Sequence, residues 1–420
     1  MAQQQSGSSG FPEIRVPALL TFLALLLGFV IGTMFRGHAG FAAIAALAGE
    51  LGSLWLKLLQ LTILPLVIGL VVTGISQTLA AAGGGRLARR AVLMFVAVLL
   101  ASGTMAAAVV PLLLGLFPIP AGAVAALSGG GAADPGKVPG FAEILEAMVP
   151  SNIFAAAANG AMLPVVIFAA LFALAATQIA EHPRKLLVTF FEGLAMTMMV
   201  IVGWVLMLAP VGVLGLAISL GAKTGADAIG GLAHYITIVS AAGLVVLLGS
   251  VAIALTVGRR QPGPFVKAML PVYAVAISTQ SSLASLPAML GASRRLGVRE
   301  ATADFVLPLA VAIFRGTSPA MNMGVAIYAA YLTGTPLTVW ALGAGVLVAF
   351  LVSLSSVSLP GTLSFVVSVG PIAMAMGVPI EPLALLVAVE MLPDIMRTLG
   401  NVTADVAVTT AVDQQGEAKA

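Results

Sequence analysis

The sequence contains no cysteine and only three histidines. Without cysteine the chain can form no disulfide, no thiolate metal site and no thioester intermediate. The three histidines, His38, His182 and His234, are far apart and do not match a metal-binding spacing. These absences exclude thiol chemistry and the common histidine-based metal sites.

Charged residues are also scarce, at 8% of the chain, whereas hydrophobic residues make up 60%. Apolar runs recur at lengths that cross a hydrocarbon core of about 30 Å. The net charge is +3, but the basic residues lie in short loops without interleaved aromatics, which is not the pattern of a nucleic-acid-binding protein. The composition predicts a multi-pass protein of the cell (inner) membrane that contacts lipid and binds no nucleic acid.

Eight long apolar spans are expected between a disordered N-terminus (1–12) and a disordered tail that begins near residue 413. Several of these spans are longer than the about 20 residues that a perpendicular helix needs, so they should tilt, kink or break. The expected ranges are 14–35, 50–80, 88–117, 149–181, 186–221, 230–258, 300–333 and 378–412.

Two further apolar segments are interrupted near their middles. Pro264–Leu296 is broken by the polar stretch Ser-Thr-Gln-Ser-Ser at 278–282 and by Pro287, and Leu337–Ile372 is broken by serines, Pro360 and Gly361. Irregular backbone does not face lipid, but it can line a cavity. We interpret both segments as re-entrant helical hairpins in inverted repeats whose tips meet near the bilayer midplane, as in transporter binding sites. Two ordinary kinked helices are the alternative.

The loop charges predict the orientation. With both hairpins returning to the side they started from, most basic loop residues fall on one side, and the positive-inside rule makes that side and both termini cytoplasmic. Only Arg36, Lys137 and Lys223 fall on the other side. The residues on the basic side are Arg86, Arg89, Arg90, Arg184, Lys185, Arg259, Arg260, Lys267, Arg294, Arg295 and Arg299.

A polar stripe runs along the last apolar span. Counted from the first of its residues, the others fall at about 40°, −20°, 20° and 60° around a helix. A charge at membrane depth costs roughly 2.5–3.5 kcal/mol, so the stripe needs partners or a ligand, and one arginine cannot satisfy three carboxylates. We predict a binding or translocation site, with mutual neutralisation as the alternative. The stripe consists of Glu390, Asp394, Arg397, Asn401 and Asp405.

These features favour a secondary active transporter over an enzyme or a channel. The enzyme alternative, an intramembrane aspartyl protease, needs two aspartates that share a proton. Asp394 and Asp405 are 11 residues apart on one helix, or about 16 Å, which is too far. A constitutive anion channel is the other alternative, but two broken hairpins facing a mixed-charge stripe fit the occlusion of a solute better.

Several motifs resemble those of the glutamate/aspartate transporters, the dicarboxylate/amino acid:cation symporters. The last span is similar to that family's final helix, and the hairpin tips, second helix and seventh helix also have similar stretches, in the same order along nearly the whole chain. The motifs are Asp394-Ile-Met-Arg397-Thr398-Leu-Gly-Asn401-Val-Thr-Ala-Asp405, Ser281-Ser282-Leu-Ala-Ser285-Leu286-Pro287, Ser356-Val-Ser358-Leu359-Pro360-Gly361, Leu61-Thr-Ile-Leu-Pro65 and Phe305-Val-Leu-Pro308-Leu309.

The resemblance implies an all-α polytopic membrane protein with eight transmembrane helices and two re-entrant hairpins, the glutamate-transporter fold, assembled as a homotrimer. It also implies an elevator mechanism, in which a transport domain carries substrate across a fixed scaffold. The implied divisions are scaffold helices 1–2 at 13–81, transport helix 3 at 82–117, scaffold helices 4–5 at 118–228, the rest of the transport domain at 229–412, and a tail at 413–420.

The resemblance implies a role for each site residue. Arg397 would bind the substrate's side-chain carboxylate, for which its planar fork is suited, and Asp394 would bind the α-amino group. The remaining substrate contacts implied are Thr398, Asn401, Ser281, Ser282, Ser358 and Ser318. The implied sodium ligands are Asp405 and Asn401 at one site, and backbone carbonyls around Ser353 to Ser356 at a second.

One stretch departs from the family. Where the seventh helix of the family carries Asn-Met-Asp-Gly-Thr, this chain has Phe314-Arg315-Gly316-Thr317-Ser318. Asn322-Met323-Gly324 lies eight residues further on and lacks the aspartate. Helix 3 also lacks family ligands, with Val98 and Ala101-Ser102 in their places. We therefore expect altered or reduced sodium coupling, with a proton carried by Glu390 as a further option.

We consider three roles for Arg315: a snorkelling residue, a second substrate-binding arginine, or a fixed charge that replaces a sodium ion. We prefer the last, with Glu390 or Asp394 as its partner. The expected substrate is a small anionic amino acid such as aspartate or glutamate, and a C4-dicarboxylate is the alternative.

Overall fold

A computed structural model of the chain describes residues 17–38, 40–127, 149–224, 227–354 and 361–417. Every regular element in these residues is a helix. In chain order the helices are α1 (Ala18–Met34), α2 (Phe41–Ala82), α3 (Arg86–Leu116), α4 (Ala121–Leu127), α6 (Ile153–Ala158), α7 (Met162–Ala176), α8 (Glu181–Met207), α9 (Ala209–Thr224), α10 (Asp227–Thr256), α11 (Pro262–Thr279), α12 (Leu286–Arg295), α13 (Glu300–Ile313), α14 (Ser318–Thr333), α15 (Val339–Ser353), α16 (Gly361–Ala375), α17 (Leu383–Leu386), the 3₁₀ turn η1 (Val387–Val389) and α18 (Met391–Glu417).

Four helices of the described chain are long and apolar enough to cross a membrane by length and composition: α2, α3, α8 and residues 229–256 of α10. The other expected spans are shorter or divided. The span expected at 149–181 is divided between α6 and α7, and the span expected at 186–221 is interrupted at Leu208, just before Pro210. A proline removes one backbone donor and clashes with the preceding turn, which explains an interruption at this point.

The last span differs from the expected 378–412 at both ends. It begins with the short helix α17 and the turn η1, and its main helix continues to Glu417. Asp413, where we expected the disordered tail to begin, is 1% exposed and accepts a 2.7 Å hydrogen bond from Arg299 Nε. The Nη2 of Arg260 lies 3.7 Å from the same carboxylate. These ion pairs hold the end of α18 against the loops before α11 and α13.

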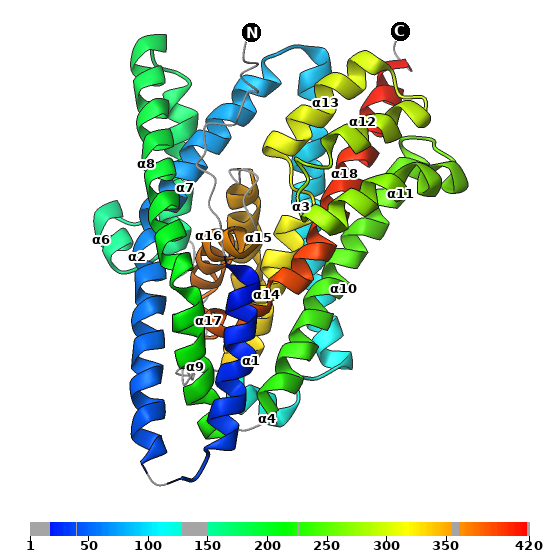
Figure 1. Ribbon diagram of the computed structural model, residues 1–420. Coiled ribbons are helices and arrows are strands. Elements are labelled where there is room, and N and C mark those ends of the chain that lie inside the picture. The colour runs from blue at the N-terminus through cyan, green and yellow to red at the C-terminus, as the bar shows by residue number, and fades with distance from the viewer. Residues whose placement is uncertain (1–16, 39, 128–148, 225–226, 355–360, 418–420) are drawn as a thin grey trace, which may run out of the picture.

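The helices form two groups in Figure 1, with α1, α2, α7, α8 and α9 on one side and α3, α10, α11, α12, α13 and α18 on the other. Helices α14, α15 and α16 lie between them. Within the first group, α9 packs along α1 and α2; within the second, α18 packs along α10 and α3 packs along α14. The hydrophobic core runs through both groups.

Small residues permit the close packing of α1 and α2 on α9. A Cβ atom at Gly32 would lie 2.5 Å from the Ile218 carbonyl oxygen, and one at Gly215 would lie 2.3 Å from the Ala48 carbonyl oxygen. Glycine at such crossings lets helix backbones approach each other where there is no hydrophobic driving force, as in lipid. Nearby, the buried Trp55 Nε1 donates a 2.9 Å hydrogen bond to the Val205 carbonyl oxygen. This group is therefore closely packed.

Both interrupted segments are pairs of helices that pack against each other. Helices α11 and α12 are separated by residues 280–285, and α15 and α16 are separated by residues that include 355–360, which lie outside the described chain. Gln280, at the end of α11, adopts a left-handed conformation (φ 49°, ψ 34°). Both α11 and α12 also pack against α18, and α16 contacts α18 as well. The breaks are thus where the serine-rich stretches predict them.

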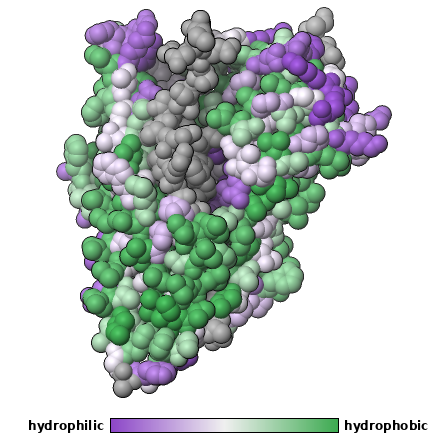
Figure 2. All heavy atoms as spheres, in the orientation of Figure 1, coloured by the Kyte–Doolittle hydropathy of each residue, from purple (hydrophilic) through white to green (hydrophobic). Residues whose placement is uncertain are grey.

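Hydrophilic residues gather at the upper end of the molecule in Figure 2, and the surface below them is largely hydrophobic. The exposed apolar side chains along the helices include Leu19, Leu61 and Phe154, which are 61%, 72% and 82% exposed. Isolated surface leucines are ordinary in soluble proteins, but a continuous apolar exterior of this kind is what a lipid-facing surface requires.

Candidate functional site

The polar stripe predicted on the last span is buried in the structure. Glu390 lies between η1 and α18, and the other four residues lie within α18. Glu390 and Asp405 are 0% exposed, and Arg397 is 2% exposed. Asp394 and Asn401 are also buried, at 5% and 3%. A segment with five buried polar residues needs either internal partners or a ligand.

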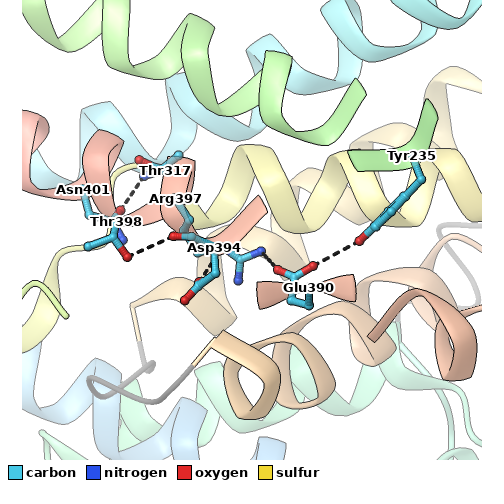
Figure 3. Close-up of polar contacts among 7 residues, drawn as sticks. All are labelled: Tyr235, Thr317, Glu390, Asp394, Arg397, Thr398 and Asn401. Carbon is cyan, nitrogen blue, oxygen red and sulfur yellow. Dashed lines mark hydrogen bonds and ion pairs between the residues drawn. The ribbon is translucent and has the colours of Figure 1, made fainter. Parts of the chain in front are cut away.

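Arg397 lies at the centre of the stripe (Figure 3). Its Nη2 donates to Glu390 Oε1, and its Nε lies 3.7 Å from Asp394 Oδ1. The Nε and Nη1 atoms are buried, and neither has a hydrogen-bond partner among the described residues. Arginine has five donors, so this guanidinium retains donors for a ligand while already being in contact with two carboxylates.

The second oxygen of Glu390 binds a tyrosine on another helix. Tyr235, on α10 and 0% exposed, donates its hydroxyl to Glu390 Oε2 at 3.1 Å (Figure 3). Tyr235 is not among the residues predicted from the sequence. The available signal was weak: it is one of four tyrosines in the chain, and a buried tyrosine hydroxyl usually needs a partner.

The span expected at 300–333 is divided around Arg315, because α13 ends at Ile313 and α14 begins at Ser318. The backbone N–H of Thr317 donates a 2.9 Å hydrogen bond to Asn401 Oδ1 on α18. A Cβ atom at Gly316 would lie 2.9 Å from Ala404 Cβ. The break therefore packs directly on α18, one turn past Arg397. Asn322 lies within α14, beyond the break.

Arg315 is 8% exposed in this break. The charges of Asp394 and, to a smaller extent, Asp405 both act on its guanidinium. Glu390, the other partner that we considered for Arg315, instead forms an ion pair with Arg397. Arg315 is therefore buried near the charged side chains of α18, Arg397 as well as the two aspartates.

Asp405 is the least satisfied acid of the stripe. Both of its carboxylate oxygens are buried, and neither has a hydrogen-bond partner among the described residues. An ionised carboxylate in this position requires a cation, because an unpaired buried charge is very costly. The donor set suits sodium, a hard cation that prefers oxygen ligands. Asn401, the other side chain expected at this site, uses Oδ1 to accept from Thr317.

The remaining predicted residues lie on α18, on other elements or outside the described chain. Thr398 is 4% exposed and donates to the Asp394 carbonyl oxygen at 3.0 Å, and Ser318 is 1% exposed at the start of α14. Ser281 and Ser282 lie in the turn between α11 and α12, and Ser353 is buried at the end of α15. Ser356 and Ser358 lie outside the described residues.

The site thus combines two buried arginines, three buried acids and an amide on α18 and the α13–α14 break. This arrangement offers buried guanidinium donors beside buried carboxylates. The model of the sodium:dicarboxylate symporter family matches residues 18–415. The chain belongs to this family. It is a membrane transporter and not an enzyme, as the sequence motifs indicated.

Individual members of the symporter family are similar to this chain over most of their length. A proton/sodium-glutamate symport protein of Bacillus subtilis (strain 168) is 27% identical over 394 residues, which covers 91% of this chain and 88% of the relative. A proton/glutamate-aspartate symporter of Escherichia coli (strain K12) is 26% identical, with 90% and 88% covered. A C4-dicarboxylate transport protein 1 of Pseudomonas aeruginosa (strain UCBPP-PA14) is 26% identical, with 93% and 87% covered.

Proposed function

We propose that this protein is a cation-coupled symporter that imports a small anionic amino acid such as aspartate or glutamate. The observation that carries the proposal is the pair of opposite charges in the buried site. Arg397 retains guanidinium donors for a carboxylate, and Asp394 lies 3.7 Å from its Nε, at a position to receive an ammonium group. An acidic amino acid supplies both charges in one molecule.

A C4-dicarboxylate such as malate is the second candidate. Relatives from Pseudomonas aeruginosa and Leptothrix cholodnii are named C4-dicarboxylate transport proteins and are 26% and 28% identical to this chain. A dicarboxylate would use Arg397 equally well. It would bring two negative charges and no ammonium group to a site where Asp394 lies beside Arg397, whereas an acidic amino acid brings a group of opposite charge for each.

Thermal-shift measurements on purified protein separate these candidates. We expect aspartate or glutamate to raise the melting temperature, because a ligand that binds only the folded state stabilises it by mass action. Neutral amino acids serve as the control and should have no effect. Stabilisation by malate but by neither acidic amino acid would refute the amino-acid assignment in favour of the dicarboxylate.

The proposal includes the architecture implied by the family. In it, eight spans and two re-entrant hairpins form the fold; α1, α2, α4 and α6 to α9 form the fixed scaffold; and α3 and α10 to α18 form the transport domain. The extensive packing of α9 along α1 and α2, and of α10 along α18, supports this division. The protomer would assemble as a homotrimer. Chemical crosslinking in native membranes can test this, with a reagent that does not require cysteine, because the chain has none.

The proposed orientation has both termini in the cytoplasm. Basic residues at the starts of α3, α8 and α13 and at the end of α12 support it, because cytoplasmic loops carry an excess of lysine and arginine. The hydrophilic upper end in Figure 2 is then the cytoplasmic face, and α18 ends there in Figure 1.

The proposed coupling ions are sodium, at Asp405 and at the end of α15, and a proton. Arg315 would act as a fixed cation in place of one sodium ion, since the charges of Asp394 and Asp405 act on it and the break that carries it packs against Ala404. A tethered charge is not released into the cell, so fewer sodium ions would move with each substrate.

A further inference from the structure

Glu390 uses both carboxylate oxygens inside the candidate site. One oxygen accepts from Arg397 Nη2, and the other accepts from the Tyr235 hydroxyl at 3.1 Å. The side chain is 0% exposed. Figure 3 shows this carboxylate lying between the guanidinium and the tyrosine. Glu390 therefore holds the arginine that the proposed substrate needs.

Resting on the proposed function, we propose that Glu390 is the proton-binding site of the transport cycle. The substrate carboxylate replaces Glu390 at Arg397, and the displaced Glu390 takes up one proton from solvent in the same step. Proton coupling then follows from competition between two carboxylates for one guanidinium.

The geometry of Arg397 makes this competition direct. A guanidinium offers two paired edges to a carboxylate, Nε/Nη2 and Nη1/Nη2, and Nη2 is common to both. Glu390 already binds Nη2. A substrate carboxylate on either edge is therefore brought against the Glu390 carboxylate at the same nitrogen. Two like charges in contact in a buried site cannot both remain ionised without a large cost.

The charge of the site leads to the same conclusion. The described site holds three buried acids, Glu390, Asp394 and Asp405, against two buried arginines. An acidic amino acid adds one further negative charge. A proton on Glu390 cancels that charge, and the new O–H group has an acceptor at hand, because a tyrosine hydroxyl can accept as well as donate. Tyr235 would change from donor to acceptor without leaving its position.

The ionisable groups that face Glu390 come from two elements, α18 with Arg397 and Asp394, and α10 with Tyr235. Behind Tyr235, the ring of Tyr328 on α14 lies 5.3 Å away, and its hydroxyl is 3.1 Å from His234 Nδ1. Helices α1 and α16 also pack against η1, and their sequences contain no ionisable side chain. Both acids contact Arg397, but Glu390 holds Nη2, the nitrogen that either edge must share with the substrate, whereas Asp394 gains the substrate ammonium group as a cation.

Calorimetry of L-aspartate binding, repeated at one mildly alkaline pH in buffers of different ionisation enthalpy, counts the protons taken up. Wild type should take up about one proton per aspartate bound, and its affinity should rise by at most about tenfold for each unit that the pH falls. Glu390→Gln should still bind aspartate, with no proton uptake and no dependence on pH. In wild type, an infrared difference spectrum should also show a new protonated-carboxyl band on binding, a readout that needs no variant.

The matched control is Glu381→Gln, which makes the same change at an exposed glutamate earlier in the same segment and should bind aspartate with the wild-type proton uptake. Aspartate binding without proton uptake in wild type, or with full uptake in Glu390→Gln, would overturn the inference and leave the proposed function intact. If neither L-aspartate nor L-malate bound, the proposed function would fail and the inference with it.

Discussion

Arg397→Ala should abolish the binding of acidic substrates. Arg397 is 2% exposed and lies in contact with Glu390 and near Asp394. Removing one partner of a buried charge pair costs roughly 3–5 kcal/mol, and 2.7 kcal/mol is about a hundredfold in affinity. We therefore expect a loss of about a hundredfold or more, measured as the dissociation constant of aspartate by calorimetry.

Two variants control for a general loss of folding. Arg294→Ala removes an arginine that is 56% exposed and should leave aspartate affinity unchanged. Asp394→Asn should weaken amino acids much more than dicarboxylates, because only amino acids carry the ammonium group. Normal aspartate binding by Arg397→Ala would mean that the stripe is structural and that the site is elsewhere.

Arg315→Met should make substrate binding depend steeply on sodium, whereas wild type should show a shallow dependence or none. In wild type the charge of the Arg315 guanidinium acts on Asp394 and Asp405. Without it, Arg397 is the one cationic side chain left beside Asp394, and the site lacks one positive charge for its buried acids, which is unfavourable. Sodium must then supply that charge before substrate binds. The measurement is the dissociation constant of aspartate across a series of sodium concentrations, with choline keeping the ionic strength constant.

Arg294→Met is the matched control for this change and should keep the wild-type sodium dependence. A steep, cooperative sodium dependence in wild type would refute the idea that Arg315 replaces a sodium ion. If instead Arg315→Met lost aspartate binding at every sodium concentration and kept its fold, Arg315 would be a second substrate-binding arginine.

Local sequence patterns predicted most of the helices. The apolar run expected at 88–117 corresponds to α3, which begins two residues earlier and ends one residue earlier. The first serine-rich break separates α11 from α12, as expected. The end of α18 was not predicted, because Asp413 is stabilised by Arg299, which lies 114 residues earlier in the chain. A pattern confined to one segment carries no information about such a pair.

For the candidate site, too, local pattern predicted the residues of one helix but not their contacts with distant segments. The helical period of 3.6 residues placed Asp394, Arg397, Asn401 and Asp405 on one face, and the structure buries all four. The contact of Tyr235 with Glu390 spans 155 residues, and that of Thr317 with Asn401 spans 84. These contacts depend on how α10 and the α13–α14 break pack against α18, which local periodicity does not determine.

The central claim is that the protein concentrates an acidic substrate by coupling it to cations through Arg397. Uptake of radiolabelled L-aspartate into reconstituted vesicles, with inward sodium and proton gradients and a higher aspartate concentration inside, tests it most directly. We predict accumulation above equilibrium that collapses when ionophores dissipate both gradients and that is absent with Arg397→Ala. Equilibration alone, with large currents that are indifferent to the gradients, would contradict the claim and identify a channel.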